Sequence, residues 1–314
     1  MLINNKGIMK KSVILFLSLV MLVCSCAGSI TANADTESIV SASSTAEKKD
    51  AKKPKVTKKQ RNGFYKRAAF VGSSIGVGQK SYFERQGKNY LGKPKMLVRG
   101  CYSFYNDKHK RKKWMVTYGG KPMQAKAAIK KSKCKRVFIA MGTNDFRGNA
   151  DVVYKDYVEY LKGIRKANPK VVIFIESTTS VTKKRQGKYL NSKNIKKLNK
   201  KMAAYCKKQK DMYFINVSSK RNDKKGNLKK KYASDNYCHL TDGAYKIWTE
   251  EMIKFTDKLI LQERAAKKAV VTAEKEKTED AYSKAKELVD GLEKSTVKDN
   301  FNKRLKAIEI VDED

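Results

Sequence analysis

The sequence has few residues that bind transition metals. It contains only two histidines, His109 and His239, and no C-x-x-C pair among the four cysteines beyond residue 35, which are Cys101, Cys134, Cys206 and Cys238. A zinc site built from cysteine and histidine is therefore not expected, and we predict no metal site and no cofactor. Four cysteines are an even number that an oxidising compartment could pair, but the sequence does not define a pairing.

Acidic residues are scarce as well. The 314 residues include 31 Asp plus Glu against 71 Lys plus Arg, a net charge of +40. This balance favours anionic partners such as cell-wall polymers or acidic glycans, although a lysine-rich composition also serves solubility. No zinc finger, RRM signature or basic heptad helix is present, so nucleic acid is not an expected partner.

The sequence also lacks an apolar run of the usual membrane-spanning length near its start. Lys10 and Lys11 precede the apolar run Val13–Val23, which matches the core of a secretory signal and is short for a membrane span. The small residues Ala32 and Ala34 favour cleavage after Ala34, so residues 1–34 are predicted to be a signal peptide, with no membrane span after cleavage. The alternative is a bacterial lipoprotein with Cys26 as the lipidated residue. Both routes place the protein outside the cytoplasm, extracellular or at the cell surface.

The rest of the chain divides into three parts. Residues 35–62 are rich in Lys, Ser, Thr and Ala and lack apolar periodicity, which predicts a solvated linker. Residues 63–262 alternate short apolar runs with stretches of helical periodicity. Five buried strands are expected, at residues 68–71, 96–98, 137–141, 171–175 and 212–215, with helices at 122–131, 150–167 and 191–208. This alternation predicts an α/β fold in which helices cover a parallel sheet.

The last part, residues 263–314, differs in charge. It holds 12 basic and 13 acidic residues, so the basic excess lies entirely in the preceding chain. Its apolar residues recur at helical spacing, with one stripe through Leu288 and Leu292 and another through Phe301 and Leu305, separated by Gly291. A small α-helical module is predicted. It resembles helical modules appended to insecticidal endotoxins and other Gram-positive secreted proteins, which implies a role in attachment or spacing.

The residues after each predicted strand are the candidates for chemistry, because ligands bind at the carboxyl ends of parallel strands. The first strand leads into Gly72-Ser73-Ser74, the second into Arg99-Gly100 and the third into Gly142-Thr143-Asn144-Asp145. Neither a P-loop nor a G-x-G-x-x-G dinucleotide motif is present there, so nucleotide binding is not expected. A serine at a tight turn between strand and helix suits a nucleophile, although an isolated serine in this place is more often a helix cap.

A nucleophilic serine needs a base, and the two histidines differ in their surroundings. His109 lies among four lysines and an arginine, where clustered positive charge opposes its protonation, so a surface role is expected. His239 follows the fifth predicted strand, directly before a helix, and Asp235 stands four residues ahead of it. His239 is the better base, and Asp235 could orient its imidazole if the loop bends.

In this order, the blocks resemble those of the SGNH (GDSL-type) hydrolases over about residues 65 to 260. The resemblance implies a flavodoxin-like three-layer sandwich with a five-stranded parallel sheet. It also implies Ser74 as nucleophile, His239 as base, and Gly100 and Asn144 as oxyanion donors. Two departures stand out: Ser73 replaces the aspartate usual before the nucleophile, and Asn236 occupies the usual place of the acid. We therefore assign Asp235 as the orienting acid.

The resulting expectation is a secreted serine esterase that hydrolyses short acyl esters, above all O-acetyl esters, on carbohydrates or cell-wall glycans. Its partners would be an acylated glycan or another small ester, with an anionic cell-wall polymer as a further candidate. A lipid esterase is the alternative enzyme. A catalytically weak or silent cell-surface or glycan-binding protein is the alternative from another class, because both departures lie at the predicted site.

Overall fold

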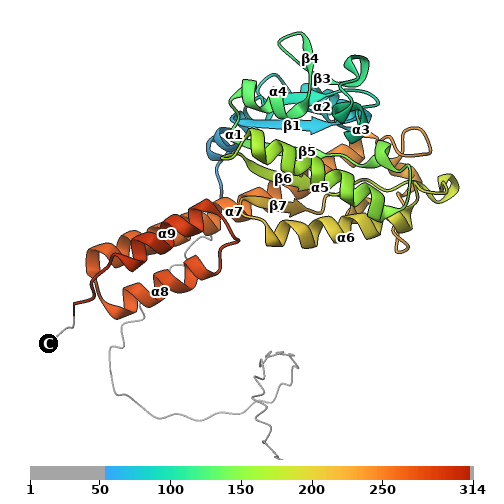
Figure 1. Cartoon of the computed structure of the whole chain (residues 1–314). Helices are drawn as coiled ribbons and strands as arrows, with labels where there is room; N and C mark the ends of the chain where they lie inside the picture. Colours follow the sequence, from blue (N-terminus) through green and yellow to red (C-terminus); the bar gives the residue numbers. More distant parts are fainter. Residues whose placement is uncertain (1–53, 312–314) are drawn as a thin grey trace, which may run out of the picture. The chain divides into compact units, whose positions relative to one another are not determined.

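The computed structural model describes residues 54–311. The predicted signal peptide, with Cys26, and most of the predicted linker therefore lie outside the described residues. Five parallel strands form the central sheet in the order β2-β1-β5-β6-β7 (Figure 1). They are β1 (Ala68–Gly72), β2 (Lys95–Val98), β5 (Arg136–Ala140), β6 (Val172–Glu176) and β7 (Met212–Ile215). All five predicted strands are present, and their order is that of a flavodoxin-like sheet.

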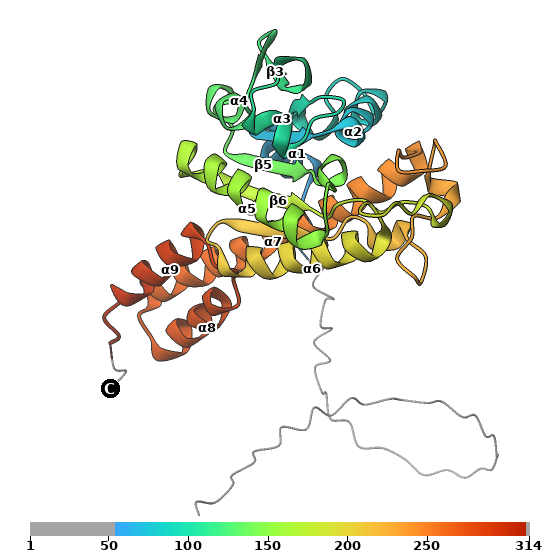
Figure 2. The ribbon, with the colours of Figure 1, turned by 45° about the vertical axis from the view of Figure 1, so that its right-hand side comes forward.

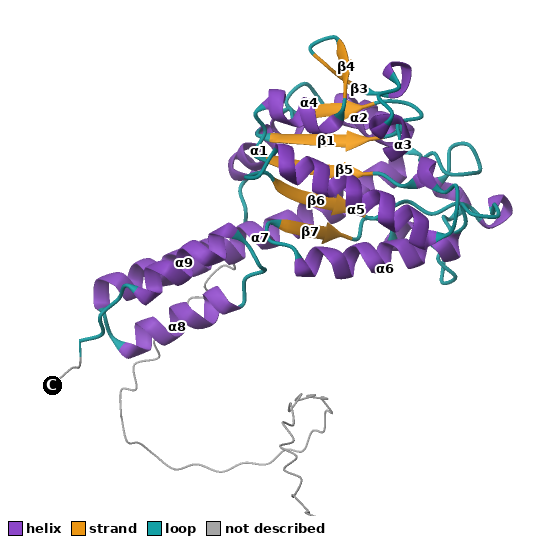
Figure 3. Cartoon of the chain, in the orientation of Figure 1, coloured by secondary structure: helices purple, strands orange, loops and turns teal. Residues whose placement is uncertain are grey.

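Helices cover both faces of this sheet and make three layers (Figure 3). On one face lie α4 (Ala125–Ser132), α5 (Ala150–Ala167) and α6 (Ser192–Lys208). Helices α5 and α6 run side by side there, as the turned view in Figure 2 also shows. The other face packs against α1 (Lys58–Lys66), α2 (Ser74–Arg85) and the first part of α7 (Asp242–Glu276).

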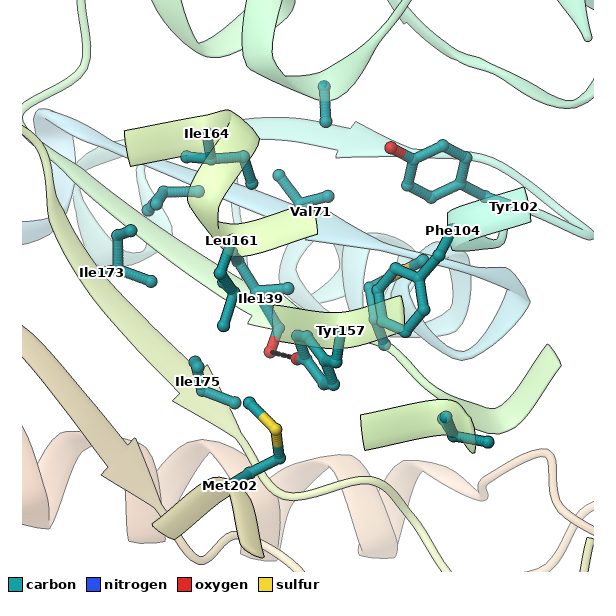
Figure 4. Close-up of a cluster of buried hydrophobic side chains, with 14 of the residues drawn as sticks. Val71, Tyr102, Phe104, Ile139, Tyr157, Leu161, Ile164, Ile173, Ile175 and Met202 are labelled. Atoms are coloured by element: carbon teal, nitrogen blue, oxygen red, sulfur yellow. Dashed lines mark hydrogen bonds between the residues drawn. The ribbon is translucent and has the colours of Figure 1, made fainter. Parts of the chain in front are cut away.

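The two faces have different apolar cores. Branched side chains of the strands, among them Val71, Ile139 and Ile173, meet Tyr157 and Leu161 of α5 (Figure 4). The opposite face carries a row of aromatic rings across β1, β5, β6 and β7, with neighbouring ring centroids 4.6–5.1 Å apart. Alternation along each strand produces this division, since successive side chains of a strand point to opposite faces.

Two segments differ from the expectations. A small antiparallel hairpin of β3 (Val116–Tyr118) and β4 (Lys121–Met123) precedes α4, so the helix predicted from residue 122 begins only at Ala125. The prediction failed here because three-residue strands leave almost no periodic signal. Helix α1 occupies residues 58–62 of the predicted linker. Thr57 starts it with a capping box, in which Thr57 and Gln60 exchange side-chain to backbone hydrogen bonds of 3.0 and 3.2 Å.

Helix α7 is a single helix of 35 residues. It runs through the expected boundary between residues 262 and 263 without a break. Its first part contributes Trp248 and Leu259 to the core under the sheet, whereas Ala266 and Val270 belong to a separate core with α8 (Glu279–Asp290) and α9 (Thr296–Lys306). The predicted helices of the tail are present, and Leu288, which was placed on one apolar stripe with Leu292, is exposed. Among the described helices, none is long and apolar enough to cross a membrane.

Candidate active site

The carboxyl ends of three adjacent strands meet at the candidate site. In the sheet register, Gly72 at the end of β1 pairs with Val98 of β2 on one side and Ala140 of β5 on the other. The Arg99 N–H also donates a 3.1 Å hydrogen bond to the Gly72 carbonyl. The loops that carry Ser74, Gly100 and Asn144 therefore leave the sheet at the same edge, as the sequence predicted.

Ser74 is the first residue of α2, where the helix dipole favours negative charge. Gly72 allows the tight turn from β1, since a Cβ there would lie 3.1 Å from the Gly76 Cα and 3.4 Å from the Ala140 carbonyl oxygen. Ser73 is the N-cap residue of α2 and is buried, but its side chain makes no capping hydrogen bond. Ser73 therefore gives the start of α2 no side-chain capping bond, and the turn is defined by backbone packing.

His239 lies opposite the nucleophile candidate. Its Nε2 atom is 3.0 Å from the Ser74 Oγ, across 165 residues of sequence. The loop that carries His239 is closed by backbone hydrogen bonds from Ser234 N–H to the His239 carbonyl (2.9 Å) and from Thr241 N–H to the Tyr232 carbonyl (3.1 Å). These bonds place the imidazole directly before the start of α7. His109 is exposed and lies against Tyr105, with a ring separation of 4.3 Å.

Asp235 contacts the other side of the imidazole. Its Oδ2 lies 2.6 Å from His239 Nδ1, and its Oδ1 accepts backbone N–H bonds of 2.8 to 3.1 Å from Tyr237, Cys238 and His239. Partial burial acts to raise the pKa of Asp235, but the hydrogen bonds from His239 and the backbone outweigh it and lower the pKa. The carboxylate is therefore held ionised and directed at the imidazole.

Asn236 explains how an acid four residues before the histidine reaches it. Its φ of 57° lies in the left-handed region, which asparagine adopts more readily than most residues. Its carbonyl accepts a 2.6 Å hydrogen bond from the Thr182 hydroxyl, which fixes the bend. The left-handed backbone of Asn236 thus bends the loop, and Asp235 is the residue that faces the imidazole.

The two predicted oxyanion donors lie in neighbouring loops. The Asn144 amide donates to the Tyr102 carbonyl at 3.0 Å, which leaves its second N–H hydrogen for another acceptor. Gly100 is part of the loop after β2, and the space around it is open, since no atom lies within 4 Å of a Cβ placed there. Their role as oxyanion donors stays a prediction.

Asp145, directly after Asn144, supports the site and was not among the residues predicted from the sequence. Its side chain is 1% exposed, and Oδ1 accepts the Phe104 N–H at 2.8 Å. Burial raises the pKa of Asp145 to about 7, against the effect of this hydrogen bond. Asp145 joins the loop of Asn144 to the start of α3 (Phe104–Lys108), and its place directly after the amide was the available signal.

A second pair of contacts joins the elements that carry Ser74 and His239. Tyr245, in the first turn of α7, donates its hydroxyl hydrogen to the Ile75 carbonyl at 2.8 Å. Gly78 makes room for that hydroxyl, because a Cβ there would lie 2.1 Å from it. At the rim, Arg85 of α2 forms an ion pair with Asp242 of α7, with a 3.0 Å bond from Nε. The relative position of α2 and α7 is therefore fixed next to the reacting groups.

Asp235, Cys238 and His239 are the group in the described residues that comes nearest to a metal site, with ligand atoms within 4.8 Å of one another. His239 Nδ1 and Asp235 Oδ2 are 2.6 Å apart. Two ligands of one tetrahedral zinc ion would stand about 3.4 Å apart. Cys238 is buried and free of a disulfide, and burial raises the pKa of its thiol to about 11. The group fits a hydrogen-bonded catalytic pair better than a metal.

A model of the GDSL-like lipase/acylhydrolase family matches residues 70–247, which contain Ser74, Gly100, Asn144, Asp235 and His239. Among curated proteins, no sequence matches the chain.

Solved structures with a similar fold include three bacterial and fungal enzymes. A GDSL-like lipase from Bacteroides thetaiotaomicron is 18% identical (TM-score 0.44, covering 61% of this chain and 89% of that one). A family 3 carbohydrate esterase from Talaromyces cellulolyticus is 13% identical (0.44, 62% and 97%). A family two carbohydrate esterase from Clostridium thermocellum, solved with cellohexaose, is 15% identical (0.39, 60% and 62%).

Proposed function

Since this chain belongs to the GDSL-like lipase/acylhydrolase family and is an ester hydrolase, we propose that it removes short acyl groups, above all O-acetyl groups, from carbohydrates. The observation that carries the proposal is the hydrogen-bonded series from Asp235 through His239 to Ser74, with distances of 2.6 and 3.0 Å. Nucleophile, base and orienting acid at hydrogen-bonding distance are the arrangement that serine hydrolases use.

The proposed mechanism has two half-reactions. His239 Nε2 takes the proton of the Ser74 hydroxyl while Oγ attacks the ester carbonyl, and the same proton then passes to the sugar oxygen as its bond to the carbonyl carbon breaks. A water molecule next gives a proton to His239 and attacks the acyl-enzyme, and His239 then returns this proton to the departing Ser74 Oγ, which releases the carboxylic acid and regenerates Ser74. The Asn144 amide and the backbone N–H groups of Ser74 and Gly100 would stabilise both oxyanions, each donor contributing about 10²–10³ in rate.

The exposure of the site supports a small acyl group on a large acceptor. The side chains of His239 and Asp235 are 45% and 34% exposed, so the catalytic groups are reached from solvent. A long acyl chain would gain little burial in such a place, whereas a glycan can lie across an open surface while it presents an acetyl group. The excess of basic residues suits an acidic glycan or cell-wall polymer.

The proposal includes export from the cell. The apolar run Val13–Val23 and the small residues before Asp35 support a cleaved signal, with Cys26 as the attachment point if the chain is instead a lipoprotein. Mass spectrometry of the secreted protein should find an amino terminus at Asp35. A lipid-modified Cys26 at the amino terminus would contradict cleavage after Ala34.

The first prediction concerns the nucleophile. Wild-type protein should hydrolyse 4-nitrophenyl acetate and release acetate from O-acetylated xylan, and Ser74→Ala should lose at least about 10³ in kcat, since only the oxyanion donors and binding remain. Ser73→Ala is the matched control, because that neighbouring hydroxyl makes no capping bond, and it should keep most of the turnover. If folded wild-type protein hydrolyses no ester, the proposed function is wrong and a binding role replaces it.

A further inference from the structure

An open groove of about 500 Å³ borders the predicted oxyanion glycine. One wall comes from α2 through Val77 and Lys80, and another comes from the segment before and within the β3–β4 hairpin through Trp114 and Thr117. Gly100, in the loop after β2, also lines the groove. The volume is in the range of small-ligand sites. The hairpin that the sequence reading did not predict is therefore part of a concave surface beside the candidate active site.

The groove starts close to the nucleophile. Val77 follows Ser74 by about one turn of α2, so both residues lie near one another along the helix. The loop residue Arg99, which also lines the groove, is bonded through its backbone N–H to Gly72, two residues before Ser74. A substrate whose carbonyl is attacked at Ser74 can thus continue past Gly100 into the groove.

The side chains around the groove favour a ring with negative charge. Trp114 is half-buried and offers an aromatic surface, and the Lys113 Nζ lies 4.9 Å from its ring centroid. The Arg99 Nε donates a 3.2 Å hydrogen bond to the Lys113 carbonyl, which holds its guanidinium in place. Lys80 is exposed and contacts Glu84 only weakly, at 3.7 Å. The residues that line the groove include no carboxylate.

We infer that this groove is a subsite for an anionic sugar unit of the acyl acceptor, with Trp114 packing against the sugar ring and Lys80 and Arg99 attracting its carboxylate or phosphate. Aromatic side chains offer flat apolar surface for ring packing, and Arg and Lys are the usual partners of such anions. The inference rests on the proposed function and deepens it, because it states which part of the substrate lies on the side of Gly100.

Kinetics on three substrates test the subsite. Trp114→Ala and Lys80→Gln should each raise KM for O-acetylated polygalacturonic acid about tenfold, a larger effect than on KM for O-acetylated xylan or on turnover of 4-nitrophenyl acetate. Trp114→Phe should restore most of the loss, because it keeps a flat ring. Lys121→Gln on the exposed side of the hairpin is the charge-matched control, since Lys121 does not line the groove.

A second test does not depend on turnover. Cys101 lines the groove and is exposed, whereas Cys206 and Cys238 are buried and Cys134 is partly buried. Alkylation of Cys101 by iodoacetamide, followed by peptide mass spectrometry on the full chain, should be slowed by trigalacturonate and not by the neutral maltotriose. Glucuronate and glucose 6-phosphate then show whether carboxylate or phosphate is preferred. Trp114→Ala should remove the protection.

The outcomes separate this inference from the proposed function. If wild-type protein turns over 4-nitrophenyl acetate, but KM for the acidic polymer is unchanged in the variants and Cys101 is not protected, the subsite is wrong and the esterase stands. If Trp114→Ala impairs hydrolysis of 4-nitrophenyl octanoate and not of the acidic polymer, the groove holds the acyl chain, which also overturns the inference. Without turnover of any ester, the proposed function fails, and protection of Cys101 alone decides whether the groove binds anionic sugars.

Discussion

At the scale of single residues, the contact between Asp235 and His239 depends on the backbone of Asn236. Its left-handed φ of 57° brings an acid four positions before the histidine to the imidazole, where the resemblance to the SGNH hydrolases implied an acid three positions before it. Asp235 was assigned as the acid from the sequence, but no local pattern showed the bend that brings Asp235 rather than Asn236 to the imidazole. Backbone dihedral angles of a loop are set by tertiary contacts such as the Thr182 hydroxyl bond to Asn236, and a local pattern does not contain them.

Asp235→Asn tests the acid. An amide can favour the wrong imidazole tautomer and provides no negative charge, a change that costs a serine protease about 10⁴ in kcat. Because Asp235 is one-third exposed, we expect a loss of about 10² to 10⁴ in kcat with little change in KM for 4-nitrophenyl acetate. Asn236→Gly should remain active, since glycine adopts positive φ freely. An active Asp235→Asn protein would show that the carboxylate is dispensable.

Glu176 gives the second prediction at this scale, which concerns pH and stability. Burial raises the pKa of Glu176 from 4.5 to about 7, although the Trp248 indole donates to it at 2.9 Å and Arg221 is near. Between these two pKa values the folded protein keeps a proton that the unfolded chain has released, so this group makes the protein less stable as pH rises from about 4.5 to about 7.

Glu176→Gln removes this titration and can still accept the Trp248 N–H. Thermal unfolding between pH 4.5 and 7.5 should therefore show a smaller fall in Tm with rising pH in the variant than in the wild type. Asp145 acts in the same direction, from 3.8 to about 7, and remains in both proteins. Equal pH dependence of Tm in the two proteins would contradict a raised pKa for Glu176.

At the scale of elements, the contact between α2 and α7 aligns the nucleophile with its base. Gly78 and Tyr245 form this contact one turn after Ser74 and shortly after His239. Gly78→Ala should lower kcat for 4-nitrophenyl acetate at least tenfold and destabilise the fold by about 1–3 kcal/mol, because the methyl group overlaps the Tyr245 hydroxyl. Tyr245→Phe alone should have a milder effect.

The double variant Gly78→Ala with Tyr245→Phe provides the control. Removal of the hydroxyl relieves the nearest overlap and leaves the ring carbon 2.7 Å from the new methyl group, so partial recovery of kcat is expected. Chemical unfolding on the same proteins separates alignment from stability. If the effects of the two substitutions on kcat are additive, the contact between Gly78 and Tyr245 does not couple α2 to α7.

Some helices and strands could be predicted from the sequence, and others could not. The five strands of the sheet were found because runs such as Val137–Ala140 are continuously apolar when both faces are buried. The first five residues of α1 were taken for linker because none of them is buried, since Tyr65 is the buried residue of this helix. The hairpin was missed because Thr117 and Lys121 face solvent and Pro122 is unusual in a strand.

At the scale of the whole molecule, the catalytic contacts are complete before the helical module begins. Every bond described for Ser74, His239 and Asp235 involves residues up to 245. A chain that ends at Arg264 should therefore keep its kcat for 4-nitrophenyl acetate within about twofold, although its Tm should fall because Asp211 loses its bonds to Thr296. Loss of turnover in a folded truncated protein, judged by circular dichroism, would show that the module supports the site.

The net charge of the chain follows from the sequence, but the positions of the basic side chains relative to the catalytic groups do not. Net charge alone does not say which cations gather beside the catalytic groups. The groove with Lys80 and Arg99 exists because α2 and the hairpin lie on either side of the loop after β2. That arrangement depends on contacts between segments distant in sequence, which composition does not encode.

Because α7 is one continuous helix, the number of residues along it sets the direction in which the helical module extends from the sheet domain. One residue inserted between Leu259 and Ala266 would turn everything beyond it by about 100° and advance it by only about 1.5 Å. Thr296 would then swing away from Asp211, with which it now shares two hydrogen bonds. An insertion of seven residues would nearly restore the original direction at a distance about 10 Å greater. The rotation about the axis of α7 therefore determines which side of the sheet domain the module can contact. A small change in the length of α7 changes the direction of the module strongly and its distance from the sheet domain only slightly.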